Sequence, residues 1–150
     1  MNTSSITATA TPPQPAQASI EVTSIAARLS VTGAPDWFTG TVVVDPLFPP
    51  NAYSAASGGL VTFTPGARTA WHAHPVGQVL IVTAGQGWLQ AWGEERRSLR
   101  AGDVAWIPPQ VKHWHGASET HAMSHIAIQE VRDGSAADWM EHVDDGQYRT

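Results

Sequence analysis

The segment 66–85 constrains this chain more than any other feature, because it places a histidine pair between two turn-forming glycines. His72 and His74 are separated by one residue, and alternate residues of a β-strand point to the same face. The two imidazoles are therefore expected to project together and to reach a single ion. A proline and a glycine then interrupt the strand, so that the chain can bring Gln78 back to the same ion.

A second stretch supplies a fourth candidate ligand. Val104–Ile107 is rich in β-forming residues, and the proline pair at positions 108 and 109 ends the run. His113 then opens the next predicted strand. The chain contains no cysteine, so a metal must bind imidazole, carboxylate or amide groups, a set that suits Mn, Fe, Zn, Ni or Co. The two stretches together predict one divalent ion bound by His72, His74, Gln78 and His113.

The amide in this ligand set changes the charge of the predicted site. Three imidazoles and a carboxylate would neutralise half the charge of a divalent ion, whereas three imidazoles and Gln78 neutralise none of it. A more positive ion in a cavity of low dielectric constant attracts anions and stabilises developing negative charge. We therefore expect Lewis-acid chemistry or anion capture rather than redox chemistry with oxygen. The loss of one anionic ligand also lowers the expected affinity for the metal.

The segment 124–129 alternates with the period of a β-strand. Its two isoleucines share one face, and His125, Ala127 and Gln129 share the other. If the isoleucines pack between sheets or subunits, the second face lines the interior next to the metal. His125 is then a candidate catalytic base, assisted by Gln129 or by another group of the cavity, and the small Ala127 leaves room for a ligand. The alternative is that His125 is a buried histidine that only satisfies its own hydrogen bonds.

Other pocket candidates come from neighbouring segments. Gly59 and Val61 occupy alternate positions of the predicted strand before the histidine pair. His115 follows His113 by two residues, so a regular strand would turn both side chains inward as neighbours of the site, whereas a bulge would turn His115 away. The chain has seven tryptophans, which suit either an aromatic-lined pocket for an aryl substrate or ordinary core packing.

Short β-rich runs separated by glycine and proline predict an all-β barrel or sandwich. These runs are Thr41–Val44, Leu60–Thr64, Val79–Thr83, Trp88–Trp92, Val104–Ile107 and Met123–Val131. The dipeptide at positions 84 and 85 is expected to be a turn, and Ala136–His142 is expected to be a short helix near the C-terminus. Residues 1–19 are uncharged and poor in large apolar side chains, which predicts a disordered N-terminal tail before a single domain at 20–150.

Composition excludes several functions. The net charge is −5, and no basic stripe suggests nucleic acid as a partner. No apolar run approaches the roughly 20 residues of a membrane-spanning helix. The first residues lack the basic and apolar regions of a secretory signal, so we expect a cytoplasmic protein. Only 14% of residues are charged and 42% are hydrophobic, which favours self-association.

The two metal-binding stretches resemble the two conserved motifs of the cupins. The first motif matches throughout, except that Gln78 stands where glutamate is usual. The second keeps its glycine, proline and histidine, but Gln110 and Ala117 replace a glycine and an asparagine. The resemblance implies a cupin jelly-roll barrel, also called a double-stranded β-helix, with the metal inside. It covers both half-motifs in the right order, so unrelated core or surface histidines are a weaker explanation.

A narrower resemblance covers about residues 28–149. It rests on the runs DWFTGTV (36–42), DPLF (45–48), FTPGARTAWHAH (63–74), KHWHG (112–116), IAIQE (126–130) and DWMEHV (138–143). These are similar to small bacterial cupins that include the manganese-dependent, R-selective hydroxynitrile lyases. The resemblance implies Mn²⁺ on three histidines and one glutamine, with Fe²⁺, Zn²⁺ or Ni²⁺ as alternatives. It also implies His125 as the base, pocket positions at Gly59, Val61 and Gln129, and a homo-oligomer, either a tetramer or a dimer.

The function expected from these residues is reversible cleavage of an R-cyanohydrin, such as mandelonitrile, to an aldehyde and hydrogen cyanide. The metal would stabilise the departing anion, His125 would take the hydroxyl proton, and an apolar pocket would hold the small-molecule substrate. Two alternatives remain. One is a metal-dependent oxygenase or decarboxylase-like cupin acting on a small aromatic compound, and the other is a cupin that binds a metal and a small ligand without catalysis.

Overall fold

The alternation predicted around His125 is present in β11 (Met123–Glu130) of the computed structural model, which describes residues 19–150. The odd-numbered residues from Met123 to Ala127 are buried, and the even-numbered residues between them are half-buried on the opposite face. One face of the strand therefore points into the barrel and the other points outward. The period of two residues in a β-strand is sufficient to place these side chains inside.

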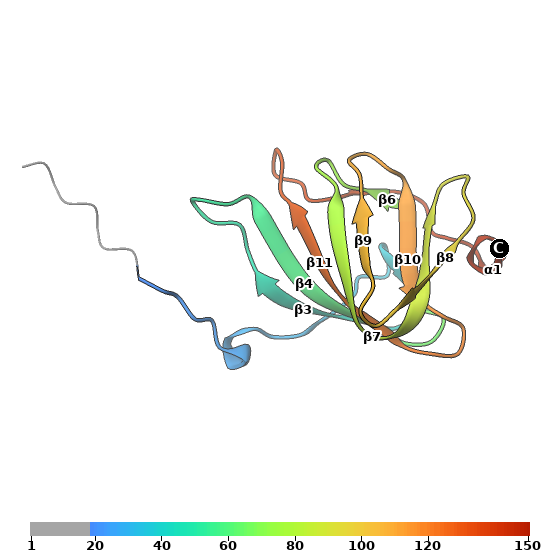
Figure 1. The fold of residues 1–150 in the computed structure, drawn as a ribbon, viewed down its shortest axis with the longest axis horizontal. Helices are drawn as coiled ribbons and strands as arrows, with labels where there is room; N and C mark the ends of the chain where they lie inside the picture. Colours follow the sequence, from blue (N-terminus) through green and yellow to red (C-terminus); the bar gives the residue numbers. More distant parts are fainter. Residues whose placement is uncertain (1–18) are drawn as a thin grey trace, which may run out of the picture.

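Twelve strands pair into one curled sheet within the described residues (Figure 1), and the predicted all-β barrel is confirmed. The main path runs β1-β3-β4-β11-β7-β10-β5-β2. The remaining elements are η1 (Ile25–Ala27), β1 (Val31–Thr32), β2 (Phe38–Thr39), β3 (Val42–Phe48), β4 (Ala56–Phe63), β5 (Arg68–Thr69), β6 (His72–Ala73), β7 (Gln78–Ala91), β8 (Arg97–Arg100), β9 (Val104–Ile107), β10 (His113–Ala117), β12 (Asp138–Trp139) and α1 (Asp145–Arg149).

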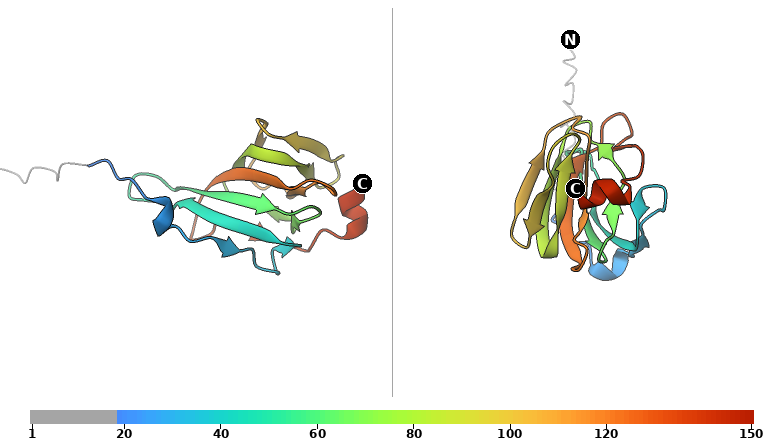
Figure 2. Two further views of the ribbon diagram at one scale, coloured as in Figure 1. Left: turned by 90° about the horizontal axis from the view of Figure 1, so that it is seen from below. Right: turned by 90° about the vertical axis from the view of Figure 1, so that its right-hand side faces the viewer.

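Strand β7 links the two layers of the barrel. The turn predicted at positions 84 and 85 is wrong, because β7 continues through both residues. Its first half pairs with β11 and β9, and its second half pairs with β10 and β8. Gly85 lies where the strand changes layers and has φ +74°. A Cβ there would approach the carbonyl oxygen of Ala122 to 1.9 Å, so only glycine fits. The chain bends at Gly85 without leaving the sheet, and the two layers face each other (Figure 2).

A hydrophobic cluster fills the closed end of the barrel. Phe63, Val82 and Met123 are at most 2% exposed and pack together from β4, β7 and β11. Leu80 belongs to a second cluster with Ile107 nearer the open end. This packing fixes the register of the central strands, so the positions of the inward-facing polar side chains follow from the core.

The C-terminal segment differs from the sequence-based expectation. The helix predicted at Ala136–His142 is wrong, because Asp138–Trp139 forms β12 and pairs with β6. The short helix α1 lies further along, where Asp144 and Gln147 form a reciprocal capping box. The predicted class of a barrel with a short C-terminal helix is therefore confirmed, with the helix displaced to Asp145–Arg149.

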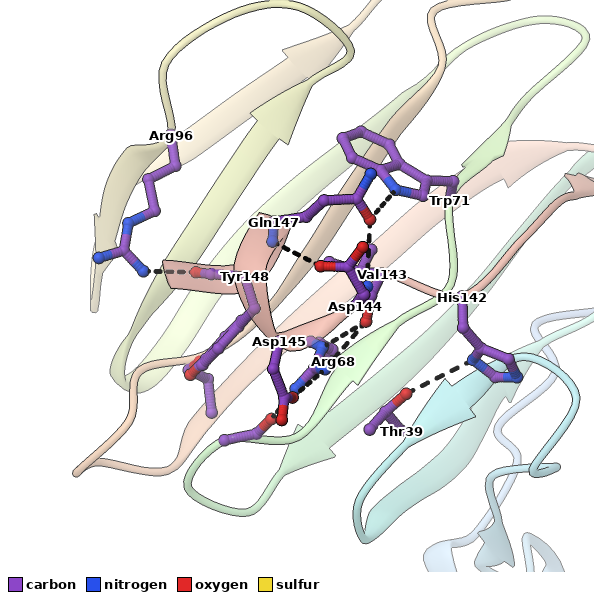
Figure 3. Close-up of polar contacts among 12 residues, drawn as sticks. Thr39, Arg68, Trp71, Arg96, His142, Val143, Asp144, Asp145, Gln147 and Tyr148 are labelled. Atoms are coloured by element: carbon purple, nitrogen blue, oxygen red, sulfur yellow. Dashed lines mark hydrogen bonds and ion pairs between the residues drawn. The ribbon is translucent and has the colours of Figure 1, made fainter. Parts of the chain in front are cut away.

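Buried Arg68 holds this C-terminal segment against the barrel (Figure 3). Its Nε and Nη2 atoms donate to the carbonyl oxygen of Val143 at 3.1 and 2.9 Å. Nη2 also forms an ion pair with Asp145 at 2.9 Å, and the guanidinium lies over the ring of Tyr148. The path of residues 134–143 across the barrel opening is thus anchored at its far end.

Two further predictions concern the N-terminal tail and membrane-spanning segments. Apart from Ser19, the predicted tail 1–19 lies outside the described residues. No helix within residues 19–150 has the length and apolar character needed to cross a membrane.

Candidate metal centre and pocket

Three histidines converge at the open end of the barrel. His72 lies in β6 and is the register partner of His113 at the start of β10, while His74 follows β6 directly. One ring nitrogen from each lies within 4.8 Å of the others, and all three residues are buried. Three buried imidazoles at this spacing can hold one metal ion.

Backbone carbonyl groups orient all three rings. The Nδ1 atoms of His72, His74 and His113 lie 3.0, 2.7 and 2.8 Å from the carbonyl oxygens of Ala70, Ala136 and Val111. Because a carbonyl oxygen only accepts, each Nδ1 carries the proton and each Nε2 keeps its lone pair. Such outer contacts are the usual way in which proteins orient metal-binding histidines.

Burial keeps these rings neutral. It lowers the pKa of His72 well below its ordinary value, and the nearby His113 lowers it further. Burial also lowers the pKa of His113 to about 4 and lowers the pKa of His74. Neutral imidazoles are the form that binds metal, so no proton has to be displaced at neutral pH.

Gln78 adds an amide oxygen beside the cluster. It begins β7, and its side chain lies next to His74, whose pKa it raises against the larger effect of burial. Its Nε2 donates to Oε1 of Gln129 at 3.1 Å, whereas its Oε1 has no hydrogen-bond partner.

The unpartnered atoms provide a test of whether a metal fits. Nε2 of His74, Nε2 of His113 and Oε1 of Gln78 are all buried without a partner. Unsatisfied buried polar atoms are costly unless something binds them. Neutral nitrogen and oxygen donors of this kind suit a divalent transition ion, so the residues present fit such a group.

A second imidazole pair lies deeper in the same cavity. Nε2 of His125 is 3.0 Å from Nδ1 of His115, so the two rings share one proton. Nδ1 of His125 and Nε2 of His115 have no partner. When both rings are neutral, one of these two free nitrogens must be a bare acceptor and the other must carry a proton. The pair therefore always presents one base and one donor.

Burial keeps this pair uncharged as well. It lowers the pKa of His125 to about 4. Burial also lowers the pKa of His115 well below the usual range, and the neighbouring His125 lowers it further. Of the two placements left open for His115, the inward one is found, because this residue is 4% exposed and faces the cavity.

The candidate metal ligands other than His113, and both rings of the deeper pair, line one cavity of about 560 Å³. This volume suits a small organic ligand. The four predicted pocket residues, Gly59, Val61, His115 and Ala127, line it together with the proposed catalytic pair His125 and Gln129. The other histidines do not, since His121 and His142 are exposed.

Sequence reasoning missed an aromatic wall on one side of this cavity. Trp139 stacks on Trp37 with ring centroids 5.3 Å apart and an interplanar angle of 7°, and Phe38 packs against it. Trp139 also stacks on His72 at 4.6 Å. Both tryptophans lie within runs quoted above, but no spacing rule connects positions a hundred residues apart.

Comparisons with known proteins agree with this architecture. Residues 59–128 match the model of the cupin domain. The crystal structure of a cupin-like protein from Thermotoga maritima superposes with a TM-score of 0.75 and 44% identity, covering 79% of this chain and 90% of that one. A cupin-2 domain from Rhodospirillum rubrum shares the fold at 16% identity and a TM-score of 0.66, over 92% of this chain and 90% of that one. The chain belongs to the cupin family.

A particular relative is more informative about chemistry. The chain is 55% identical over 130 residues to the (R)-mandelonitrile lyase of Granulicella tundricola. The match covers 87% of this chain and 99% of the relative, so it includes the histidine cluster.

Proposed function

We propose that this cupin is a metal-dependent hydroxynitrile lyase, which reversibly cleaves R-cyanohydrins such as mandelonitrile to an aldehyde and hydrogen cyanide. The observation that carries the proposal is the 55% identity to an (R)-mandelonitrile lyase along nearly its whole length. The site supports it independently, because acceptor nitrogens, a candidate base and an aromatic wall all border one cavity.

His72, His74, His113 and Gln78 would hold the divalent ion, and Mn²⁺ is the proposed metal. A bound ion with no anionic ligand supplies Lewis-acid stabilisation of the negative charge that develops on the departing cyanide. The surrounding carbonyl groups keep the three imidazoles in position, so little reorganisation accompanies the reaction.

His125 is proposed to take the hydroxyl proton of the cyanohydrin. Its ring is neutral well below pH 7, because burial lowers its pKa to about 4. With the shared proton on Nε2 of His125, Nδ1 is the free acceptor and Nε2 of His115 is the donor at the other end of the pair. The reverse reaction, cyanide addition to an aldehyde, returns the proton along the same path.

The aromatic wall of Trp37, Phe38 and Trp139 is proposed to hold the aryl group of the substrate. Gly59 and Ala127 line the same cavity with little or no side chain and leave room for a ring. Stacking against fixed aromatic rings is favourable for an aryl substrate and also excludes water from the reacting carbon.

We also propose a homo-oligomer, either a dimer or a tetramer. On the outer face of the sheet, Ile81 pairs with Ile126 and with Val104, and Val104 is 67% exposed. Trp106 lies on the same strand and is 61% exposed. An exposed apolar face of this kind favours association, which light scattering would measure. The single domain at 20–150 and the cytoplasmic location stay predictions.

The direct test is synthesis of mandelonitrile. Mn²⁺-loaded protein is incubated with benzaldehyde and cyanide at mildly acidic pH, and the product is resolved by chiral chromatography. We expect an excess of the R enantiomer from the wild type, and only racemic background product from metal-free protein and from His125→Ala. Racemic product at the background rate from all three samples would reject the lyase proposal.

A further inference from the structure

Three polar side chains form one row across the barrel opening. Ser57 in β4, Gln129 in β11 and Gln78 in β7 are direct register partners on three adjacent strands. Nε2 of Gln129 donates to Oγ of Ser57 at 3.0 Å, and Oε1 of Gln129 accepts from Nε2 of Gln78 at 3.1 Å. The row ends at Oε1 of Gln78, which is buried and unpartnered beside the histidine cluster.

The direction of this chain of hydrogen bonds is determined at its far end. The hydroxyl of Ser57 donates its one proton to the backbone carbonyl oxygen of Gln129 at 3.2 Å, and a carbonyl oxygen can only accept. Oγ of Ser57 must therefore accept from the Gln129 side chain, which has to present its NH₂ group. Gln129 then has only its oxygen left for Gln78, which must present NH₂ in turn. By this logic Oε1 of Gln78 faces the histidines.

We propose that Ser57 is a positioning residue that acts through Gln129 and orients the amide of Gln78 with its oxygen toward the bound cation. This inference rests on the proposed metal site and adds to it a residue that does not touch the metal. The same chain assigns Gln129 a positioning role, because both polar ends of its side chain are engaged. Gln129 is then not the group that assists His125 with the substrate proton.

An amide needs such a device and a carboxylate does not. The two ends of the Gln78 amide are chemically different, and an NH₂ group pointing at the cation would be repelled. The two oxygens of a glutamate at this position would be equivalent, so either could bind the metal. Replacing Gln78 by glutamate should therefore remove the dependence on Ser57, whereas a purely structural role for Ser57 in β4 would be the same with either residue.

The experiment is a double-mutant cycle with Mn²⁺ as the probe. Binding is titrated by the electron paramagnetic resonance signal of free Mn²⁺ for the wild type, Ser57→Ala, Gln78→Glu and the double variant. We expect Ser57→Ala to weaken Mn²⁺ binding by about three- to tenfold, the size expected for one oriented hydrogen bond. In the Gln78→Glu background the same substitution should not weaken binding, because loss of the Ser57 hydroxyl lets Gln129 turn its NH₂ group toward the carboxylate. Ser57→Thr keeps the hydroxyl and should bind like the wild type.

Ser124→Ala is the matched control, because Ser124 makes a cross-strand hydroxyl contact with Thr62 at 2.8 Å on the outer face of the same strands. It should leave Mn²⁺ affinity unchanged, and thermal unfolding of each variant reports its folding. Equal affinity of Ser57→Ala and wild type, or equal weakening in both backgrounds, would overturn the positioning role alone. A wild type that binds neither Mn²⁺ nor Zn²⁺ would overturn the proposed metal site together with this inference.

Discussion

The imidazoles of His125 and His115 contact each other edge to face, with ring centroids 4.7 Å apart and a shared proton between Nε2 and Nδ1. Neither ring belongs to the proposed ligand set, and both face the cavity. Under the proposed function the two groups would therefore have separate roles within one small space: the histidine cluster nearer the opening would bind the cation, and the deeper pair would handle the proton.

Replacing His125 tests this separation. We expect His125→Ala to lower kcat for mandelonitrile cleavage by about 100-fold or more, because general-base catalysis contributes this much in other enzymes. Mn²⁺ content measured by mass spectrometry should equal that of the wild type. His121→Ala is a suitable control, because His121 is exposed in a turn. Loss of metal together with activity in His125→Ala would contradict the division between the two groups.

The stacked Trp139 gives a second prediction. Truncation to alanine removes the ring that lies against both Trp37 and His72, so it should affect aryl substrates most. We expect KM for mandelonitrile to rise by about five- to tenfold, the magnitude of one aromatic contact. KM for the cyanohydrin of a short aliphatic aldehyde should change much less. Steady-state kinetics on both substrates measures the ratio, and Tyr53→Ala provides the comparison, because Tyr53 is 97% exposed and lines no part of the cavity.

Local patterns in the sequence predicted the inward-facing residues well. Strand periodicity alone predicts that His72 and His74 project together and that His125 points inward. Both predictions are met, because the histidine pair converges and His125 is buried. Each motif also carries its own turn residues, so its position relative to the sheet follows from local geometry.

The partners of these residues depend on long-range register, which local patterns do not contain. Ser57 meets Gln129 only because β4 pairs with β11 in one register, and Trp139 reaches His72 only because β12 pairs with β6. The continuous β7 was missed because Gly85 looks like a turn residue, although it bends a strand here. The C-terminal helix was within reach of sequence reasoning, since Asp144 and Gln147 have the spacing of a capping box.

Acid should destabilise the metal-free protein over a defined range of pH. Burial lowers the pKa of His125 to about 4, from the 6.5 of an ordinary histidine. Between these values the unfolded chain binds a proton that the folded protein rejects, so stability is complete above pH 6.5 and falls toward pH 4. This residue alone should contribute roughly 3 kcal/mol to the loss. Urea unfolding across this range measures it, and His125→Phe should show a shallower slope. Equal slopes for both proteins would show that His125 is not neutral when folded.

The last prediction concerns the anchor of the segment that crosses the barrel opening. Arg68→Met keeps most of the aliphatic bulk but leaves the carbonyl oxygen of Val143 without its two donors (Figure 3). We expect the free energy of unfolding to fall by about 2–4 kcal/mol, because a buried acceptor loses a charged partner. Asp145→Asn should cost much less, about 0–1 kcal/mol, because the Asp145 side chain is 77% exposed and its ion pair is screened by water. Urea denaturation of both variants gives the comparison. Because residues 134–143 carry the carbonyl group that orients His74 and the ring that stacks on His72, Arg68→Met should also weaken Mn²⁺ binding, although Arg68 lines no part of the cavity. Equal unfolding free energies for the two variants would show that the exposed ion pair, and not the buried contact with Val143, anchors the segment.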